Sequence, residues 1–161
     1  KGGLEAITKP ALAAVADGRI AWIGKNSDLY FALFYGAARV GIVMVPIGWR
    51  LAPTEWAYIA KDTGARVLFA GHGFEIAVLA LADQADTVDR VIGESEARSM
   101  IDATPRNAFD PADPDDAALQ LYTVIDADDQ ASHVQGGIPT LIRLDELSAE
   151  FTKAVVENLW W

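Results

Sequence analysis

The chain has 161 residues, about the length of one ordinary domain, and none of them is cysteine, which excludes disulfides and Cys-based zinc sites. Its formal charge of −10, from 23 acidic and 13 basic residues, argues against nucleic acid or an anionic membrane as partner, because these ligands require clustered Lys and Arg. No apolar run reaches the length of a membrane helix and no secretion leader follows Lys1. We therefore expect a cytoplasmic protein with no integral membrane segment.

Between residues 19 and 92, short β-type runs alternate with longer amphipathic runs. This alternation predicts βαβ units and hence an α/β fold, an open and mainly parallel sheet with flanking helices. The predicted strands span residues 20–23, 42–45, 67–70 and 90–92, and the predicted helices span residues 28–40, 53–63 and 74–82.

The helix after the first strand carries the clearest local signals. Asn26 and Ser27 are able to cap it, Asp28 stands in its first turn and Gly41 follows its end. Its large apolar residues recur at helical spacing and predict a face packed on the sheet rather than a cofactor site; they are Tyr30, Phe31, Phe34, Ala37 and Ala38.

The ends of the chain fit the alternation less well. A short helix is expected within residues 4–16, with a break at Pro10. A short helix followed by a Pro-marked loop is expected between residues 94 and 114, and one more strand over residues 117–122. Residues 126–137 are predicted to be loop, and residues 145–159 an amphipathic helix.

Several residues invite a chemical interpretation, and each has a simpler structural one. The Asp-rich stretch 110–129 lacks the Gly turn and distal Glu of an EF-hand, so we interpret it as a solvated loop. Ser132-His133 has no nucleophile elbow around it. His72 follows a strand, where α/β ligands bind, but is expected to be a turn residue. Gly24-Lys25-Asn26-Ser27 lacks the upstream glycines of a P-loop.

Four strings resemble the adenylate-forming enzymes, in particular the amino-terminal part of acyl-CoA synthetases and related AMP-binding ligases. They occur in the family's order and cover about residues 17–123. The strings are Arg19-Ile-Ala-Trp-Ile-Gly-Lys-Asn-Ser27, the helix 29–41 with Ala37-Ala38-Arg39, Trp49-Arg-Leu-Ala-Pro-Thr-Glu55 after Val45-Pro46, and Asp62-Thr-Gly-Ala-Arg-Val-Leu-Phe69.

The resemblance implies ATP, Mg²⁺ and CoA as the family's cofactors and a phosphate loop of approximate signature Tyr-Thr-Ser-Gly-Thr-Thr-Gly-x-Pro-Lys-Gly. Thr123, after Tyr122, matches the first Thr and is the candidate cofactor-binding residue. The chain then continues Val124-Ile-Asp-Ala-Asp-Asp129, whose carboxylates repel a polyphosphate, and Gly136-Gly137 is followed by Ile138-Pro139 and by no Lys. The family's downstream motifs have no counterpart either.

We therefore expect two parts: residues 1–123, a partial synthetase α/β region, and residues 124–161, an unassigned acidic loop plus helix. We expect no catalytic residue, no metal ligand and no bound cofactor in this chain, and a fragment that is inactive alone. Two alternatives remain open. One is self-association through apolar surface that a larger domain would cover, and the other is small-molecule binding without chemistry.

Overall fold

The computed structural model describes residues 18–103, 115–123 and 138–143. The helices expected within residues 4–16 and 145–159, the acidic residues 126–129, and Ser132-His133 lie outside the described residues.

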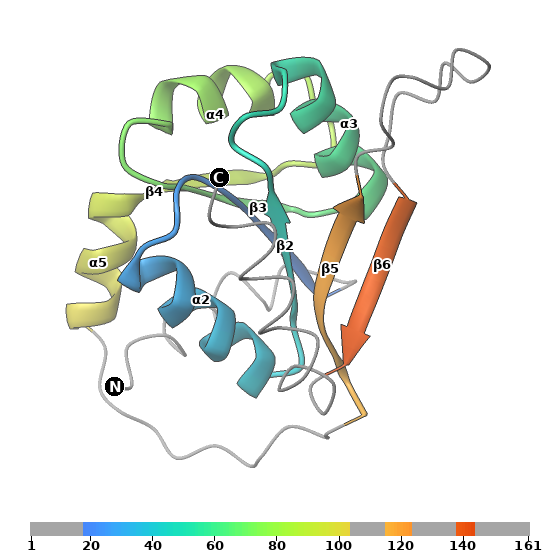
Figure 1. The fold of residues 1–161 in the computed structure, drawn as a ribbon. Coiled ribbons are helices and arrows are strands. Elements are labelled where there is room, and N and C mark those ends of the chain that lie inside the picture. Colours follow the sequence, from blue (N-terminus) through green and yellow to red (C-terminus); the bar gives the residue numbers. More distant parts are fainter. Residues whose placement is uncertain (1–17, 104–114, 124–137, 144–161) are drawn as a thin grey trace.

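The described strands form a six-stranded sheet in the order β4-β3-β1-β2-β5-β6 (Figure 1). β1 to β5 run parallel, and β6 pairs antiparallel with β5 at the edge. The fold is therefore α/β with a mainly parallel sheet, as the sequence predicts. The strands are β1 (Arg19–Ile23), β2 (Val43–Ile47), β3 (Val67–Ala70), β4 (Arg90–Gly93), β5 (Ala117–Thr123) and β6 (Ile138–Arg143).

In the described part of the chain, helices cover both faces of the sheet, two on each face. The helices are α2 (Asp28–Arg39), α3 (Pro53–Thr63), α4 (Glu75–Ala82) and α5 (Glu94–Ala103). The buried side chains of α2 and α5 join one core cluster, and those of α3 and α4 join the other. This arrangement follows from right-handed crossovers, because the chain moves from β1 to β2 in one direction and from β2 through β3 to β4 in the other.

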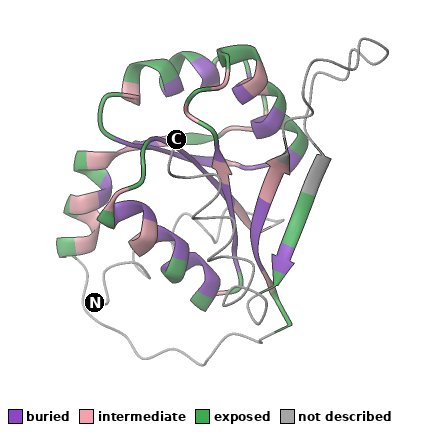
Figure 2. Cartoon of the chain, viewed as in Figure 1, coloured by how far each residue is buried: buried purple, intermediate pink, exposed green. Residues whose placement is uncertain are grey.

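Strand β1 lies at the centre of the sheet, and its side chains show how the two cores are divided. Ile20 and Trp22 point to the α2 side, whereas Ala21 and Ile23 point to the α3 side, and all four are almost fully buried. Figure 2 shows buried residues along the inner strands of the sheet and exposed residues on the helices, in the loops and on the edge strand β6.

Local signals explain where the helices begin and end. The Ser27 hydroxyl accepts a hydrogen bond from the backbone N–H of Tyr30 at 3.1 Å, which confirms the predicted cap of α2. α3 begins at Pro53, where the Glu55 carboxylate accepts a bond from the Ala52 N–H at 2.6 Å. It ends at Thr63 and is followed by Gly64, whose φ of 66° is left-handed.

Strand β6 is the element that the sequence analysis missed. Its six residues contain Pro139, which lacks the N–H that an interior strand needs and which is tolerated here because β6 lies at a sheet edge. Within the described parts of the chain, no helix combines the length and apolarity needed to cross a membrane.

Candidate functional site

The carboxyl ends of β1 and β3 form the point of the sheet where a ligand is expected. The connection after β1 leads to α2 on one face, and the connection after the neighbouring strand β3 leads to α4 on the opposite face. In open α/β sheets, ligands bind in the crevice where adjacent connections diverge in this way.

The loops that follow β1 and β3 approach each other closely, and the Trp22 indole packs against them. A Cβ added to Gly24 would lie 2.8 Å from Cα of Gly71, and a Cβ added to Gly71 would lie 2.9 Å from Cζ2 of Trp22. Two glycines are thus required for the β1 and β3 loops to approach each other over Trp22.

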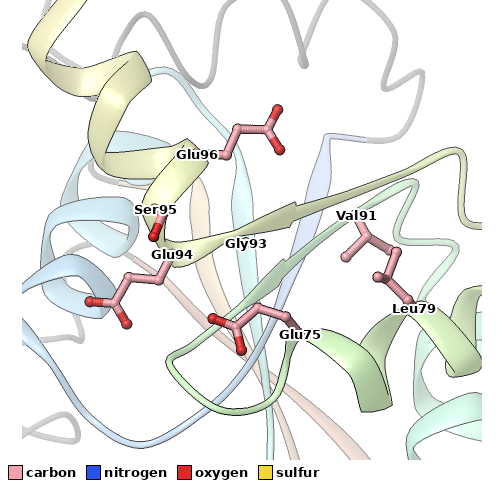
Figure 3. Close-up of a pocket in the computed structure, with 7 residues that line it drawn as sticks. All are labelled: Glu75, Leu79, Val91, Gly93, Glu94, Ser95 and Glu96. Carbon is pink, nitrogen blue, oxygen red and sulfur yellow. The ribbon is translucent and has the colours of Figure 1, made fainter.

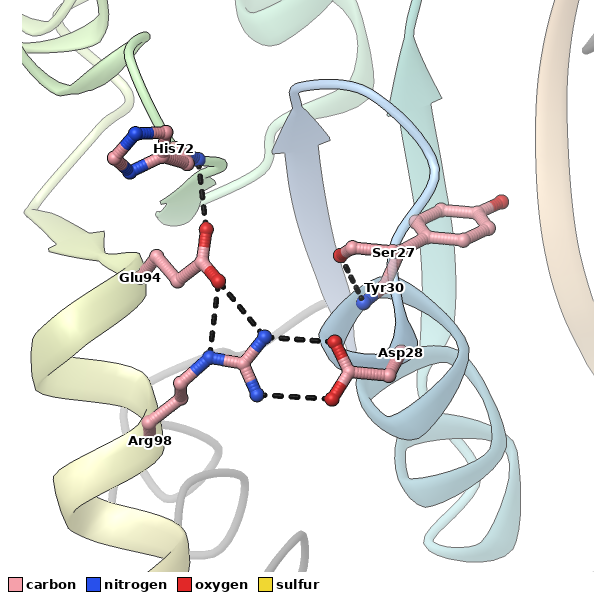
Figure 4. A network of polar contacts seen from close by, with 6 residues as sticks. All are labelled: Ser27, Asp28, Tyr30, His72, Glu94 and Arg98. Atoms are coloured by element: carbon pink, nitrogen blue, oxygen red, sulfur yellow. Dashed lines mark hydrogen bonds and ion pairs between the residues drawn. The ribbon is translucent and has the colours of Figure 1, made fainter.

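A polar network braces the two loops from the side (Figure 4). Arg98 on α5 donates to both carboxylate oxygens of Asp28, at 2.7 and 3.0 Å, and from Nε and Nη2 to Glu94, at 2.9 and 2.8 Å. The second Glu94 oxygen accepts from the backbone N–H of His72 at 2.9 Å. The hydrogen bonds from Arg98 lower the pKa of Asp28 to about 2, and those from Asp28 and Glu94 raise the pKa of Arg98.

Two of the residues singled out in the sequence take part in this network through structural contacts. His72 is exposed and contributes its backbone N–H, as expected of a turn residue. In the segment Gly24–Ser27, the Ser27 hydroxyl is engaged as the cap of α2.

An aromatic and cationic cluster lies at the same edge of the sheet, and the sequence analysis did not find it. Nζ of Lys25 lies 5.3 Å from the centroid of the Trp49 ring, and Cζ of Arg50 lies 4.8 Å from it. Phe74 packs edge-on to Trp49 and to Trp56, with ring centroids 6.1 and 6.4 Å apart. Residues that follow β1, β2 and β3 are thereby brought together. Within the described residues, neither cation has a carboxylate partner.

A second network of hydrogen bonds connects β1, β5 and α3. Arg19 Nε donates to the buried Gln120 side chain at 2.9 Å, and Gln120 Nε2 donates to the Tyr122 hydroxyl at 3.1 Å. That hydroxyl donates to Asp62 at 2.6 Å. Desolvation, followed by the bond to Asp62, raises the pKa of Tyr122. The network joins β5 to β1 and to α3.

Thr123, the candidate residue from the sequence, is the last residue of β5 and pairs across the hairpin with Ile138. It stands at the carboxyl edge of the parallel sheet, where β5 neighbours β2. Among the described residues, no group of three or more His, Asp or Glu side chains is placed to hold a metal ion.

Comparisons with known proteins agree on one family. The model of the family described as "AMP-binding enzyme" matches residues 11–124. The fatty acid–[acyl-carrier-protein] ligase ScoC of Streptomyces coeruleorubidus is 36% identical over 117 residues, which are 69% of this chain and 22% of ScoC. The long-chain-fatty-acid–CoA ligase FadD13 of Mycobacterium tuberculosis is 35% identical over 70% of this chain and 23% of FadD13. The chain thus spans less than a quarter of the length of these relatives.

Solved structures of acid–CoA ligases are similar to this chain in fold, again over about a quarter of their own length. A Mycobacterium tuberculosis fatty acyl CoA synthetase has a TM-score of 0.65 and 31% identity, over 76% of this chain and 25% of that one. The anthranilate CoA ligase AuaEII, in complex with anthranoyl-AMP, has a TM-score of 0.72 over 88% of this chain and 27% of that one. At 16% identity, AuaEII is similar in fold alone.

Proposed function

We propose, from the premise that this chain belongs to the AMP-binding enzyme family, that it supplies one α/β layer of an ATP-dependent acid ligase and does not catalyse the reaction by itself. In the parent reaction, a carboxylate attacks the α-phosphate of ATP to give an acyl-adenylate and pyrophosphate. The thiol of CoA then displaces AMP to give the thioester. We further propose a cytoplasmic location, in keeping with a chain that has no cysteine.

The β5–β6 hairpin carries this proposal. Tyr122 pairs with Pro139 and Thr123 pairs with Ile138, so β5 and β6 flank the segment 124–137. In the family signature, the initial Tyr-Thr and the final Pro-Lys-Gly would flank the Gly-rich phosphate loop in the same way. In sequence, Gly137-Ile138-Pro139-Thr140 repeats the Gly-x-Pro of the signature and has Thr in place of its Lys. The Thr140 residue is exposed.

This difference matters because the Lys would offset negative charge on the phosphates as the bond to pyrophosphate breaks. A threonine hydroxyl carries no charge. The intervening segment contributes Asp126, Asp128 and Asp129, which raise the electrostatic cost of placing a triphosphate there.

Pyrophosphate release tests the proposal. The purified chain, first shown to be folded by cooperative thermal unfolding, is incubated with ATP, Mg²⁺, CoA and either hexadecanoate or benzoate. FadD13 with hexadecanoate is the positive control. We expect release no faster than in the blank without acid. Release that depends on both ATP and acid would refute the proposal that the chain is inactive alone.

A second candidate function, binding of an anionic small molecule without chemistry, is favoured by the cluster of Lys25, Trp49 and Arg50. Two cations over one half-buried indole offer charge and an aromatic face together. If this function is correct, AMP, ATP or an acyl-CoA should raise the melting temperature as concentration increases and alter Trp fluorescence. Lys25→Met and Arg50→Met should each reduce the shift, whereas Lys61→Met, on the exposed side of α3, should leave it unchanged. An equal loss in all three variants would contradict a defined site.

Self-association is the remaining alternative, and the exposed Leu141 on the edge strand β6 supports it. Its side chain is 52% exposed, next to unpaired backbone groups at the described edge of the sheet. Sedimentation velocity over a hundredfold range of concentration tests this alternative. A monomer throughout would refute it, and a dimer weakened by Leu141→Lys would support it.

A further inference from the structure

A shallow cleft at the opposite edge of the sheet has a composition that the ligase function does not explain. It lies beside the edge strand β4, between α4 and the start of α5, and has a volume of about 360 Å³ (Figure 3). Its lining combines acidic and apolar side chains. The lining residues are Glu75, Leu79, Val91, Gly93, Glu94, Ser95 and Glu96.

The apolar part of this surface comes from α4. The helix reads Glu-Ile-Ala-Val-Leu-Ala-Leu-Ala and buries only Val78 and Leu81, so its outer face is apolar as well. Ile76 is 85% exposed and Leu79 is 56% exposed. Leu79 lies beside Val91 in the cleft (Figure 3), which makes the exposed apolar surface continuous from helix to strand.

The acidic part of the lining comes from the first turns of α4 and α5. Glu94 and Glu96 pair with Arg98 and Arg90, at 2.8 and 2.6 Å. Glu75 has no cationic partner among the described residues, so the cleft carries uncompensated negative charge. Among the described residues, no group of three acidic side chains is placed to bind a metal ion. A metal ion is therefore not the ligand that we infer for the negative charge of this cleft.

We propose that this cleft docks a protein segment whose apolar residues are flanked by Lys or Arg. The apolar side chains of the segment would cover Leu79 and Val91, and its cations would lie against Glu75. Charge argues against the other occupants: a second copy of a chain with net charge −10 would bring further acid to an acidic surface, and so would nucleic acid or an anionic membrane. This inference does not depend on the proposed ligase function.

Fluorescence anisotropy with two labelled amphipathic peptides of equal length tests the proposal on the full chain. One contains Leu and Lys, and the other contains Leu and Glu. We expect saturable binding of the Leu/Lys peptide alone, weakened about fivefold between 50 and 300 mM NaCl. Glu75→Gln should weaken it several-fold and Leu79→Ser about tenfold or more.

Two matched variants separate a defined site from general attraction to an acidic protein. Leu141→Ser alters a leucine of similar exposure, 52%, at the other edge of the sheet, and Asp102→Asn removes a charge from the end of α5; each should change binding less than twofold. The proposal is overturned if the Leu/Lys peptide does not bind, if the Leu/Glu peptide binds as well, or if the control variants weaken binding as much as Leu79→Ser. A dimer that Leu79→Ser dissociates would overturn it in favour of a second copy.

Discussion

Arg98 and Asp28 lie 70 positions apart in the chain and form a two-pronged ion pair, with N–O distances of 2.7 and 3.0 Å. The pair links α5 to the first turn of α2, the helix that leaves the central strand. Arg98 also donates a hydrogen bond to Glu94, and Glu94 accepts one from the backbone N–H of His72 in the loop after β3. One guanidinium thus ties three segments of the carboxyl edge together.

We expect this pair to make stability depend on pH in acid. The pKa of Asp28 is lowered to about 2 from an unfolded value of about 3.9, so its contribution is present above pH 4 and is lost as the pH falls toward 2. The difference in melting temperature between the unmodified chain and Asp28→Asn should therefore shrink between pH 5 and pH 2. Asp102→Asn, at an exposed site on α5, is the control. A difference that stays constant with pH would contradict the pair's role.

Gly24→Ala should destabilise the fold through backbone crowding. The new Cβ would lie 2.8 Å from Cα of Gly71, which no side-chain rotation relieves, and we expect a loss of about 1–3 kcal/mol. Gly48→Ala is the matched control, since its Cβ meets only the flexible Leu51 side chain at 3.4 Å. Urea unfolding measures both. Equal stability of the two variants would show that the β1 and β3 loops can separate at little cost.

Two buried tryptophans provide a test of hydrogen-bond satisfaction. Nε1 of Trp56 donates to the carbonyl oxygen of Gly48 at 2.9 Å, whereas Nε1 of Trp22 has no partner among the described residues. Trp56→Phe removes a made bond, and Trp22→Phe removes a group that is already unpaired. After correction for the volume lost, we expect Trp56→Phe to be the more costly by about 1 kcal/mol in urea unfolding. The reverse order would mean that the Trp22 N–H is paired in solution.

The Tyr122 hydroxyl should contribute to the stability of β5. Tyr122→Phe breaks its bonds to Asp62 and Gln120, and we expect a loss of about 0.5–1.5 kcal/mol. A double-mutant cycle with Asp62→Asn isolates the coupling between the two side chains. Because the pKa of Tyr122 is raised, its stabilising contribution is present below its unfolded pKa of about 10 and is lost above it. Additive effects of the two substitutions would rule out the coupling.

The sequence was informative wherever signals are local. Ser27, Pro53 and Gly64 mark helix ends in the structure as their side chains and backbone preferences require. The prediction failed at β6, because Ile138–Arg143 is short and contains Pro139, which is unfavourable in an interior strand. Only pairing with β5 makes this segment a strand, and that partner is not encoded locally.

The candidate sites likewise divide into features with a local signal in the sequence and features that depend on contacts between distant segments. The sequence singled out His72 and Lys25 by their place after strands, and the structure puts both at the carboxyl edge, with the His72 backbone bound to Glu94 and Lys25 over Trp49. It gave no sign of the Arg98–Asp28 pair or the cleft beside α4. Those features join segments far apart in the chain, and residue order says nothing about such distances.

By itself, the sequence determined the α/β class, the order of β1 to β5 along the chain, and membership of the AMP-binding enzyme family, because alternating hydrophobic periods and ordered motifs are properties of residue order. The tertiary structure alone decided the order of strands in the sheet, the hairpin that brings Thr123 opposite Ile138, and the placing of Lys25 and Arg50 on one indole. These depend on which surfaces pack together, and that choice is made by the burial of the whole core rather than by any one segment.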